Sequence, residues 1–501
     1  MEERAAVVCV PEGRDLIHIP GRAIPTTFEC IEAVALREPG RLALLQDTQS
    51  WSYGTFYDDL VSVVRVLDHV GVRRGHRVAV GVVGLQAGML LLIACENLGA
   101  VTTSFLPRND PDREAVLAMV DWVISDEPQP CPDNVRFQLL DNAFMARIGA
   151  IDPSDGATFP RVALALHEPQ RISRTAGPSG KSRFMILARQ AQEYWVRTGA
   201  ENGGYRPETR LLLTGPLVMN AFFARGSACL RMGAAVLALD LVGPLAHEFT
   251  HVLALPALLE QLLDRLPAGH MPGRRVEVGT VGGFVPPQLR ERAARVLGGR
   301  IASRYGANET CGICDDMDAS GNGVVSAGVD IRIVDEQENE LPPGELGIIA
   351  VRTPGMAESY IGDEEGSRKA FRDGWFYSGD WGALVAPRVL RLAGRHDDLV
   401  NLAGTKIPAV QLEQRIREVA SVRDCAVLAV NLQSGAFSVG IALVLDAAAS
   451  REAVVLALNE KLRLGPTLNA RVLFVENLPR GANGKPDRIA LQRLFLALPP
   501  V

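Results

Sequence analysis

Several features are scarce in this chain, and their scarcity excludes whole classes of protein. Only 8 of the 501 residues are cysteine, without a framework spacing, which argues against a disulfide-stapled secreted scaffold. No charge of one sign dominates, because 52 Lys and Arg face 58 Asp and Glu for a net charge of −6. Nucleic acid and anionic membrane surfaces are therefore not expected as main partners. With 47% hydrophobic and 22% charged residues, wholesale disorder is excluded as well.

Long apolar runs are also rare, and one needs interpretation. Val78–Cys95 is apolar except for Gln86 and reaches the length of a membrane helix. Three glycines interrupt it, so we expect a buried strand followed by a helix that ends near Gly99, and no membrane span. The N-terminal 15 residues carry acids and no long apolar run, which argues against a signal peptide. A cytoplasmic protein with reduced thiols is expected.

The order of the predicted elements indicates an α/β fold. Strand-like and helical stretches alternate through the first 300 residues, which is typical of largely parallel sheets covered by helices. From about Val324 the pattern changes to short strands and turns. We predict a large N-terminal domain over 1–394, including a β-rich subdomain at about 324–394. A small, mobile α+β C-terminal domain is expected over 395–501.

One short motif points to a different chemistry. His247 to His251 reads HEFTH and matches the HExxH signature of zinc hydrolases, in which both histidines share one helical face. Pro244 lies just upstream, and the sequence from Thr250 to Pro256 reads as a strand. A strand starting at Thr250 would take the two histidines out of helical register. A zinc hydrolase is kept as the less favoured alternative.

A glycine- and hydroxyl-rich basic loop offers a phosphate site. Residues 173–183 read SRTAGPSGKSR, and such loops bind phosphate through backbone N–H groups and a lysine. The loop is not a Walker A motif, because Thr175 stands where that pattern needs glycine.

Four further segments carry side chains suited to nucleotide chemistry. Ser303–Thr310 offers a glycine turn, an aromatic face and a carboxylate suited to Mg²⁺. Trp375–Asp380 places a carboxylate after a glycine, where it could accept hydrogen bonds from sugar hydroxyls. Gly394–Gly404 opens the last domain, and Pro479–Arg488 presents Lys485 between glycine and proline.

In this order and spacing, the motifs resemble those of the adenylate-forming superfamily of acyl- and aryl-CoA synthetases, adenylation domains and luciferase. The matching segments, spread over nearly the whole chain, are WSYGTFYDDL, ENLGAVTTSFLP, SRTAGPSGKSR, THVLALPALLEQLL, YGANE, ELPPGELGIIAVRTPG, YSGD, GRHDDLVNLAGTKIPAVQLE and ANGKPDR.

The resemblance implies a two-step ligase. Members use Mg²⁺ and ATP to convert a carboxylic acid to an acyl-adenylate and pyrophosphate. Most then transfer the acyl group to a thiol. The expected partners are a small-molecule carboxylic acid and either CoA or the phosphopantetheine of a free-standing acyl carrier protein.

The resemblance also assigns roles to individual residues. Lys485 would be catalytic, and Glu309 would be catalytic and would hold Mg²⁺. The nucleotide-binding residues would be Ser173, Thr175, Gly177, Lys181, Gly282, Gly283, Phe284, Tyr305, Gly306, Asn308, Asp380 and Arg395. Asp397 would be the hinge about which the C-terminal domain rotates, and Gly404 would serve the thiol step.

The acid pocket is predicted from the same motifs. Its lining would comprise Met219, Asn220, Phe223, Val281, Ala307 and Gly312. Members that activate α-amino acids usually carry an aspartate in the segment that reads TGPLVMNAFF here, and this segment has none. Because an unpaired buried ammonium is costly, an aryl or small-to-medium aliphatic acid is expected instead.

The phosphate loop departs from the family pattern. Arg174 replaces a usual glycine, Ala176 replaces a usual threonine, and the loop is one residue longer before Lys181. A catalytically impaired adenylate-binding homologue is therefore the main alternative. Retention of Lys485 and Glu309 favours an active enzyme.

Overall fold

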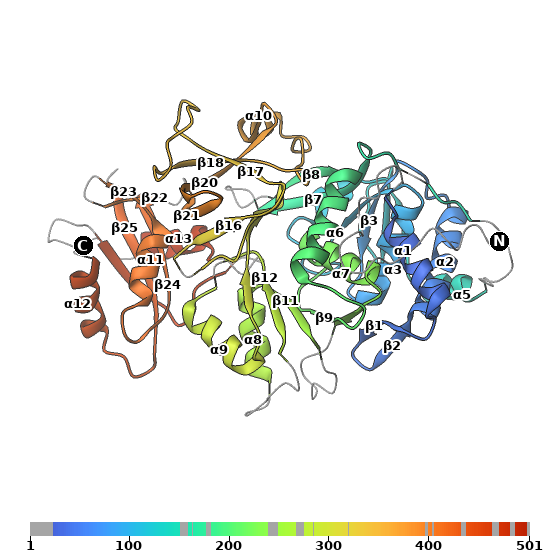
Figure 1. Ribbon diagram of the computed structural model, residues 1–501, viewed down its shortest axis with the longest axis horizontal. Coiled ribbons are helices and arrows are strands. Elements are labelled where there is room, and N and C mark those ends of the chain that lie inside the picture. The colour runs from blue at the N-terminus through green and yellow to red at the C-terminus, as the bar shows by residue number, and fades with distance from the viewer. Residues whose placement is uncertain are drawn as a thin grey trace. The chain divides into compact units, whose positions relative to one another are not determined.

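A computed structural model describes the chain as two compact units (Figure 1). Unit 1 comprises Met1–Ile313 with Thr353–Phe371, and unit 2 comprises Cys314–Arg352 with Arg372–Val501. The residues described are 24–150, 159–162, 164–176, 182–238, 249–266, 275–283, 285–318, 320–395, 399–402, 405–431, 437–462, 470–480 and 486–497. The predicted boundary near residue 394 stays a prediction.

A seven-stranded sheet forms one half of unit 1, in the order β13-β12-β11-β9-β10-β1-β2. Its strands are β1 (Leu42–Gln46), β2 (Gln49–Ser52), β9 (Arg210–Leu213), β10 (Ala235–Ala238), β11 (His251–Ala254), β12 (Glu277–Thr280) and β13 (Ile301–Ser303). All neighbours pair in parallel except β1 and β2. Its inner strands are apolar, as expected where helices cover both faces.

A six-stranded sheet forms the other half, in the order β6-β5-β3-β4-β7-β8. Its strands are β3 (Arg77–Gly81), β4 (Val101–Ser104), β5 (Trp122–Ser125), β6 (Arg136–Leu139), β7 (Pro169–Ala176) and β8 (Ser182–Ala188). Only the pairing of β7 with β8 is antiparallel. The predicted α/β class with largely parallel sheets is confirmed.

A layer of helices lies between these two sheets (Figure 1). It contains α1 (Thr27–Arg37), α2 (Tyr53–Val70), α3 (Leu85–Asn97), α6 (Arg189–Gly203) and α7 (Asn220–Arg231). Helices α2 and α7 contact the seven-stranded sheet, and α3 and α6 contact the six-stranded one. The other helices of unit 1 are α4 (Arg113–Ala118), α5 (Asn142–Gly149), α8 (Pro256–Arg265), α9 (Pro287–Leu297) and α10 (Glu364–Ala370).

Local sequence explains where these helices begin and end. The Thr26 hydroxyl accepts from the N–H of Glu29, whose carboxylate accepts from the N–H of Thr26, so a capping box starts α1. Ser52 caps α2, and Gly71 ends it at a φ of 101° that favours glycine. The apolar run at 78–95 divides into β3 and α3 as predicted. Within the described ranges, no helix is both long and apolar enough for a membrane span.

Unit 2 begins with an antiparallel sheet and confirms the change in pattern expected from about Val324. The strand order is β16-β21-β20-β18-β17, and the end of β15 pairs with β16. The strands are β15 (Cys311–Asp315), β16 (Asn322–Val325), β17 (Asp330–Val334), β18 (Gly347–Arg352), β19 (Phe371–Arg372), β20 (Trp375–Ala386) and β21 (Val389–Arg395). Trp375 lies beneath two guanidinium groups, of Arg332 at 4.0 Å and Arg352 at 4.7 Å.

The last hundred residues form the expected α+β arrangement. Strands β22 (Leu399–Leu402) and β23 (Thr405–Pro408) make a hairpin. A separate sheet contains β24 (Val422–Asn431), β25 (Phe437–Leu445) and β26 (Ala470–Phe474). Helices α11 (Ala409–Arg417) and α12 (Arg451–Leu462) share one apolar cluster with this sheet, and α13 (Arg488–Leu496) shares another.

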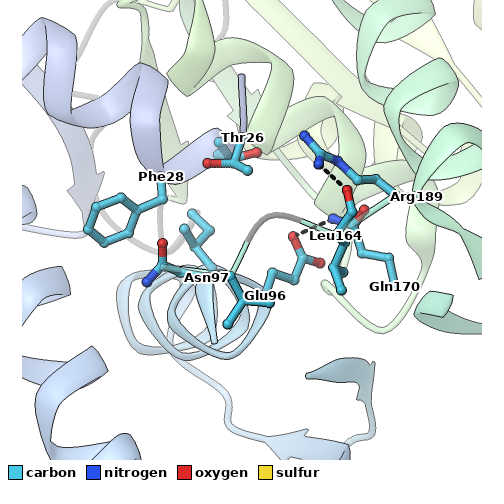
Figure 2. A pocket seen from close by; sticks show the side chains of 10 residues that line it. Thr26, Phe28, Glu96, Asn97, Leu164, Gln170 and Arg189 are labelled. Carbon is cyan, nitrogen blue, oxygen red and sulfur yellow. Dashed lines mark hydrogen bonds between the residues drawn. The ribbon is translucent and has the colours of Figure 1, made fainter. Parts of the chain in front are cut away.

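A half-buried glutamate on α3 lies in the helix layer of unit 1. Glu96 accepts hydrogen bonds from the Gln170 amide at 3.1 Å and from the Thr102 hydroxyl at 3.2 Å. The Glu96 and Gln170 side chains border a cavity of about 20 Å³ (Figure 2), enough for one water-sized group. Burial raises the pKa of Glu96 to about 7, although Arg171 opposes the shift. Glu96 therefore holds its proton at a pH at which an exposed glutamate has lost it.

This shift predicts a specific pH dependence of folding. Because the pKa of Glu96 is higher in the folded chain, the folded state loses relative stability as the pH rises from about 4.5 to about 7. Glu96→Gln removes the titrating group. The free energy of unfolding of the variant, relative to that of the unchanged protein, should therefore increase by about 3 kcal/mol as the pH rises from 4.5 to 8. Urea denaturation across this pH range measures the difference.

The matched control is Glu114→Gln, which changes an exposed glutamate on α4. Its stability curve should run parallel to that of the unchanged protein. A Glu96→Gln curve that is also parallel would contradict the assignment of this pH dependence to Glu96.

Candidate active site

The carboxyl edge of the seven-stranded sheet gathers most of the predicted nucleotide and acid contacts. The register pairs Leu213 with Leu253, Ala254 with Thr280, and Thr280 with Ser303. Four parallel strands therefore end side by side. The segments that follow three of them carry Met219 with Asn220, Val281 with Gly282 and Gly283, and Tyr305 through Glu309. Ligands of open α/β sheets bind at this edge.

Two glycines at this edge are required by the backbone. Gly282 has a φ of 81°, and a Cβ there would lie 2.8 Å from Leu255 Cδ2. A Cβ at Gly306, in β14 (Tyr305–Ala307), would lie 2.5 Å from the carbonyl oxygen of Cys311. The close approach at Gly306 brings the turn around Ala307 against the segment that continues to Gly312.

The predicted phosphate loop begins in a β-hairpin of the other sheet. Strand β7 carries Ser173 and Thr175, which share one face because strand side chains alternate. Strand β8 returns antiparallel, with Thr175 opposite Arg183.

One hydrogen bond joins this hairpin to the edge just described. The side-chain amide of Asn308 donates to the carbonyl oxygen of Arg174 at 2.7 Å. The phosphate hairpin of the six-stranded sheet and the YGANE segment, which follows β13 of the seven-stranded sheet, are thereby in direct contact.

Glu309 is buried, and a residue from far along the chain holds its carboxylate. The Tyr360 hydroxyl donates to Glu309 Oε1 at 2.9 Å. Burial and the Glu309 charge together raise the pKa of Tyr360, so the phenol remains a donor at any ordinary pH. The Arg183 guanidinium lies 5.0 Å from the centre of the Tyr360 ring and pairs with Asp363 at 3.1 Å. A carboxylate fixed in this way fits the oxygen ligands that Mg²⁺ prefers.

The predicted acid pocket is backed by polar groups. Asn220 donates to the Gln192 side-chain carbonyl at 3.1 Å, and both residues are buried. Arg171 is 1% exposed, and its guanidinium lies 4.1 Å from the centre of the Phe223 ring. It donates to the carbonyl oxygen of Leu217 at 3.2 Å. Burial lowers the pKa of Arg171 to about 10, and Glu96 opposes the shift, so the side chain stays cationic near neutral pH.

Two predicted ribose contacts belong to unit 2 and lie opposite each other. Asp380 on β20 is the register partner of Arg395 on β21. The N–H of Asp380 donates to the Ser378 hydroxyl oxygen at 3.1 Å, and Gly379 before it has a φ of 71°. The remaining predicted site residues, which are Gly177, Lys181, Phe284, Asp397, Gly404 and Lys485, lie outside the described residues.

The HEFTH segment has its second histidine in a strand. His251 opens β11, so the helical register that HExxH needs does not reach it. Its ring receives a hydrogen bond from, or donates one to, the Thr250 hydroxyl at 2.8 Å and packs edge-on against Tyr205. Burial lowers the pKa of His251. His247 and Glu248 lie outside the described residues. Among the residues described, no group of three or more His, Cys, Asp or Glu side chains forms a metal-binding cluster.

Sequence reasoning missed several residues that support this site. Arg171 shares a strand face with Ser173 and Thr175, and that alternation was an available signal. Tyr360 lies 51 residues after Glu309, and no local pattern links the two. Their contact depends on the bridge between Met185 and Tyr360, which places that segment beside β8.

Known proteins share both sequence and fold with this chain. The family model described as AMP-binding enzyme matches residues 187–361. An indoleacetate–CoA ligase of Aromatoleum aromaticum is 25% identical over 91% of this chain and 96% of its own length. A 2-succinylbenzoate–CoA ligase of Bacillus mycoides is 25% identical over 92% of this chain and 97% of its own.

A solved structure supports the same placement. The ATP-bound MatB of Rhodopseudomonas palustris superposes with a TM-score of 0.80, covering 94% of this chain and 99% of its own at 21% identity. At 21% identity, this match is evidence for a shared fold and not for a shared substrate. The segment 187–361 thus matches the AMP-binding enzyme family, and the whole chain shares its fold with a solved ATP-bound member and about a quarter of its residues with curated CoA ligases.

Proposed function

We propose that this protein is an ATP-dependent, AMP-forming acid–thiol ligase. The observation that carries the proposal is the contact between the phosphate hairpin and the YGANE segment, made by Asn308 and the Arg174 carbonyl. It brings the predicted phosphate contacts beside the predicted Mg²⁺ ligand Glu309 at the carboxyl edge of the sheet.

The chemistry requires two anions to react. A carboxylate oxygen of the acid forms a bond to the α-phosphorus of ATP, the bond from that phosphorus to the bridging oxygen breaks, and pyrophosphate leaves. Charge neutralisation and alignment are the main contributions that a protein can make to such a step. Glu309 would hold the Mg²⁺ that supplies part of this neutralisation. Lys485 would contact the carboxylate and the α-phosphate.

The second step would use a thiol. A thiolate sulfur attacks the acyl carbon, a thioester forms, and AMP leaves with the electron pair of the broken C–O bond. CoA is the acceptor named in the two relatives above. The phosphopantetheine of a free-standing carrier protein is the other acceptor that this chemistry allows.

An aryl or small-to-medium aliphatic acid fits the predicted pocket best. Phe223 brings aromatic surface to it, and the 214–223 segment carries no carboxylate to pair with an α-ammonium. The two relatives act on indoleacetate and 2-succinylbenzoate, which are aryl acids. We also propose domains at 1–394 and 395–501, a hinge at Asp397, the thiol-step role of Gly404 and a cytoplasmic location.

The first prediction concerns the catalytic lysine. Purified protein should exchange labelled pyrophosphate into ATP in the presence of a pool of aryl or aliphatic acids. Lys485→Ala should slow this exchange by about 10²–10³-fold, since one charge-stabilising contact to the reacting groups is lost. AMP binding, measured by calorimetry, should change little.

Two outcomes separate the alternatives. AMP binding without exchange in any pool would identify the impaired homologue. Zinc bound at one equivalent per chain, measured by elemental analysis, would favour the hydrolase alternative.

The second prediction concerns the support of Glu309. Tyr360→Phe removes the hydroxyl that holds the carboxylate, so we expect about a tenfold lower kcat and a higher Mg²⁺ requirement. Tyr57→Phe is the matched control, because Tyr57 also donates to a glutamate, Glu32, at 2.6 Å. Equal effects of both substitutions would show that Tyr360 contributes only general stability.

A further inference from the structure

At the base of the phosphate hairpin, one carboxylate oxygen contacts both strands. Arg174 near the end of β7 reaches Asp112 Oδ2 with Nη1 at 3.0 Å. Ser182 at the start of β8 donates to the same oxygen at 2.6 Å. Asp112 therefore ties together the strand that enters residues 177–181 and the strand that leaves them.

A second carboxylate binds the same guanidinium in a fork geometry. Arg174 Nη1 donates to Asp110 Oδ1 and Nη2 donates to Asp110 Oδ2, both at 2.7 Å. Asp110 has no exposed side-chain surface, while Arg174 is 16% exposed. Such bidentate pairs fix geometry as well as adding energy. We call the three side chains Asp110, Asp112 and Arg174 the carboxylate clamp.

The carboxylates of the clamp are themselves fixed by backbone groups. Asp110 accepts from the N–H of Leu106 at 2.8 Å and from that of Asp112 at 2.9 Å. Burial alone would raise the pKa of Asp110, but Arg174 and these N–H groups hold it below its usual value. Asp110 therefore remains ionised near neutral pH and can hold the guanidinium.

Within the clamp, the guanidinium and the carbonyl oxygen of Arg174 contact different segments. Its guanidinium is bound to two carboxylates, while its carbonyl oxygen accepts from Asn308. The arginine thus links the Asp110–Asp112 turn, the phosphate hairpin and the YGANE segment. It stands where the family usually has glycine, and two ion pairs rather than a flexible glycine set the local conformation.

We propose that Arg174 is a positioning residue for the triphosphate of ATP. The clamp holds Ser173 and Thr175, the neighbours of Arg174 on β7, in the geometry that receives the β- and γ-phosphates. The inference rests on the proposed function, and it reverses the expectation that this arginine impairs the loop. Preorganised contacts of this kind lower the cost of ordering a site on binding.

Charge supports the same conclusion. The clamp contains one cation and two anions, so removal of Arg174 leaves two uncompensated carboxylates, one of them buried. They would repel the triphosphate and release the two strands. Arg174→Gly introduces the residue that is usual in the family. Because it also removes the cation that pairs with both carboxylates, we expect it to weaken ATP binding.

The test compares two nucleotides by titration calorimetry. AMP lacks the β- and γ-phosphates, so a loss confined to ATP reports on positioning of the loop, whereas a loss of stability affects both nucleotides. For Arg174→Gly we expect an ATP Kd about tenfold or more above that of the unchanged protein, with the AMP Kd within about twofold. Arg174→Lys keeps the charge but loses the bidentate geometry. Its ATP Kd should lie between those of the unchanged protein and Arg174→Gly.

The control and a second variant make the result decisive. Arg161→Gly removes a different arginine, which pairs with Glu32, and should leave both affinities unchanged. Should Arg174→Gly fail to fold, Asp112→Asn tests the same clamp and should also weaken ATP selectively. Equal losses for ATP and AMP, or tighter ATP binding by Arg174→Gly, would overturn the proposal. Failure of the unchanged protein to bind either nucleotide would instead overturn the proposed function, and the clamp's role with it.

Discussion

The candidate site depends on holding the end of one sheet against the end of another. The phosphate hairpin belongs to the six-stranded sheet, and the YGANE segment follows a strand of the seven-stranded one. A layer of helices lies between the two sheets, and side-chain hydrogen bonds join their ends beyond it. Asn308 donates to the Arg174 carbonyl, and Arg171 on β7 donates to the Leu217 carbonyl after β9. The bond from Tyr360 to Glu309 supports this junction from the side of β8.

Buried charges in unit 1 are matched by nearby polar groups. Glu193 and Arg231 pair at 2.6 Å between α6 and α7, and Arg171 donates to hydroxyls on β4. Burying charge is expensive unless partners are in place, and pairs of this kind add geometric specificity more reliably than stability. The first pair fixes α6 against α7, and the Arg171 bonds fix β7 against β4.

Much of the architecture followed from local patterns. The break of the apolar run at 78–95 into strand and helix, the strand at His251 and the change to antiparallel strands all came from periodicity and glycine or proline placement. These features depend on neighbours within a few residues. The resemblance to the superfamily likewise came from short motifs, through their order and spacing along the chain.

The sequence by itself determined the fold class, the motif residues and the lack of an acidic residue in the 214–223 segment. It also showed that Arg174 departs from the family pattern, which suggested an impaired loop. Only the tertiary structure decided that the guanidinium of Arg174 faces two carboxylates more than sixty residues earlier and that Tyr360 holds Glu309. The physical reason is that an ion pair or a hydrogen bond is set by distance in space. Its partners can come from any part of the chain, and no local periodicity records which ones meet.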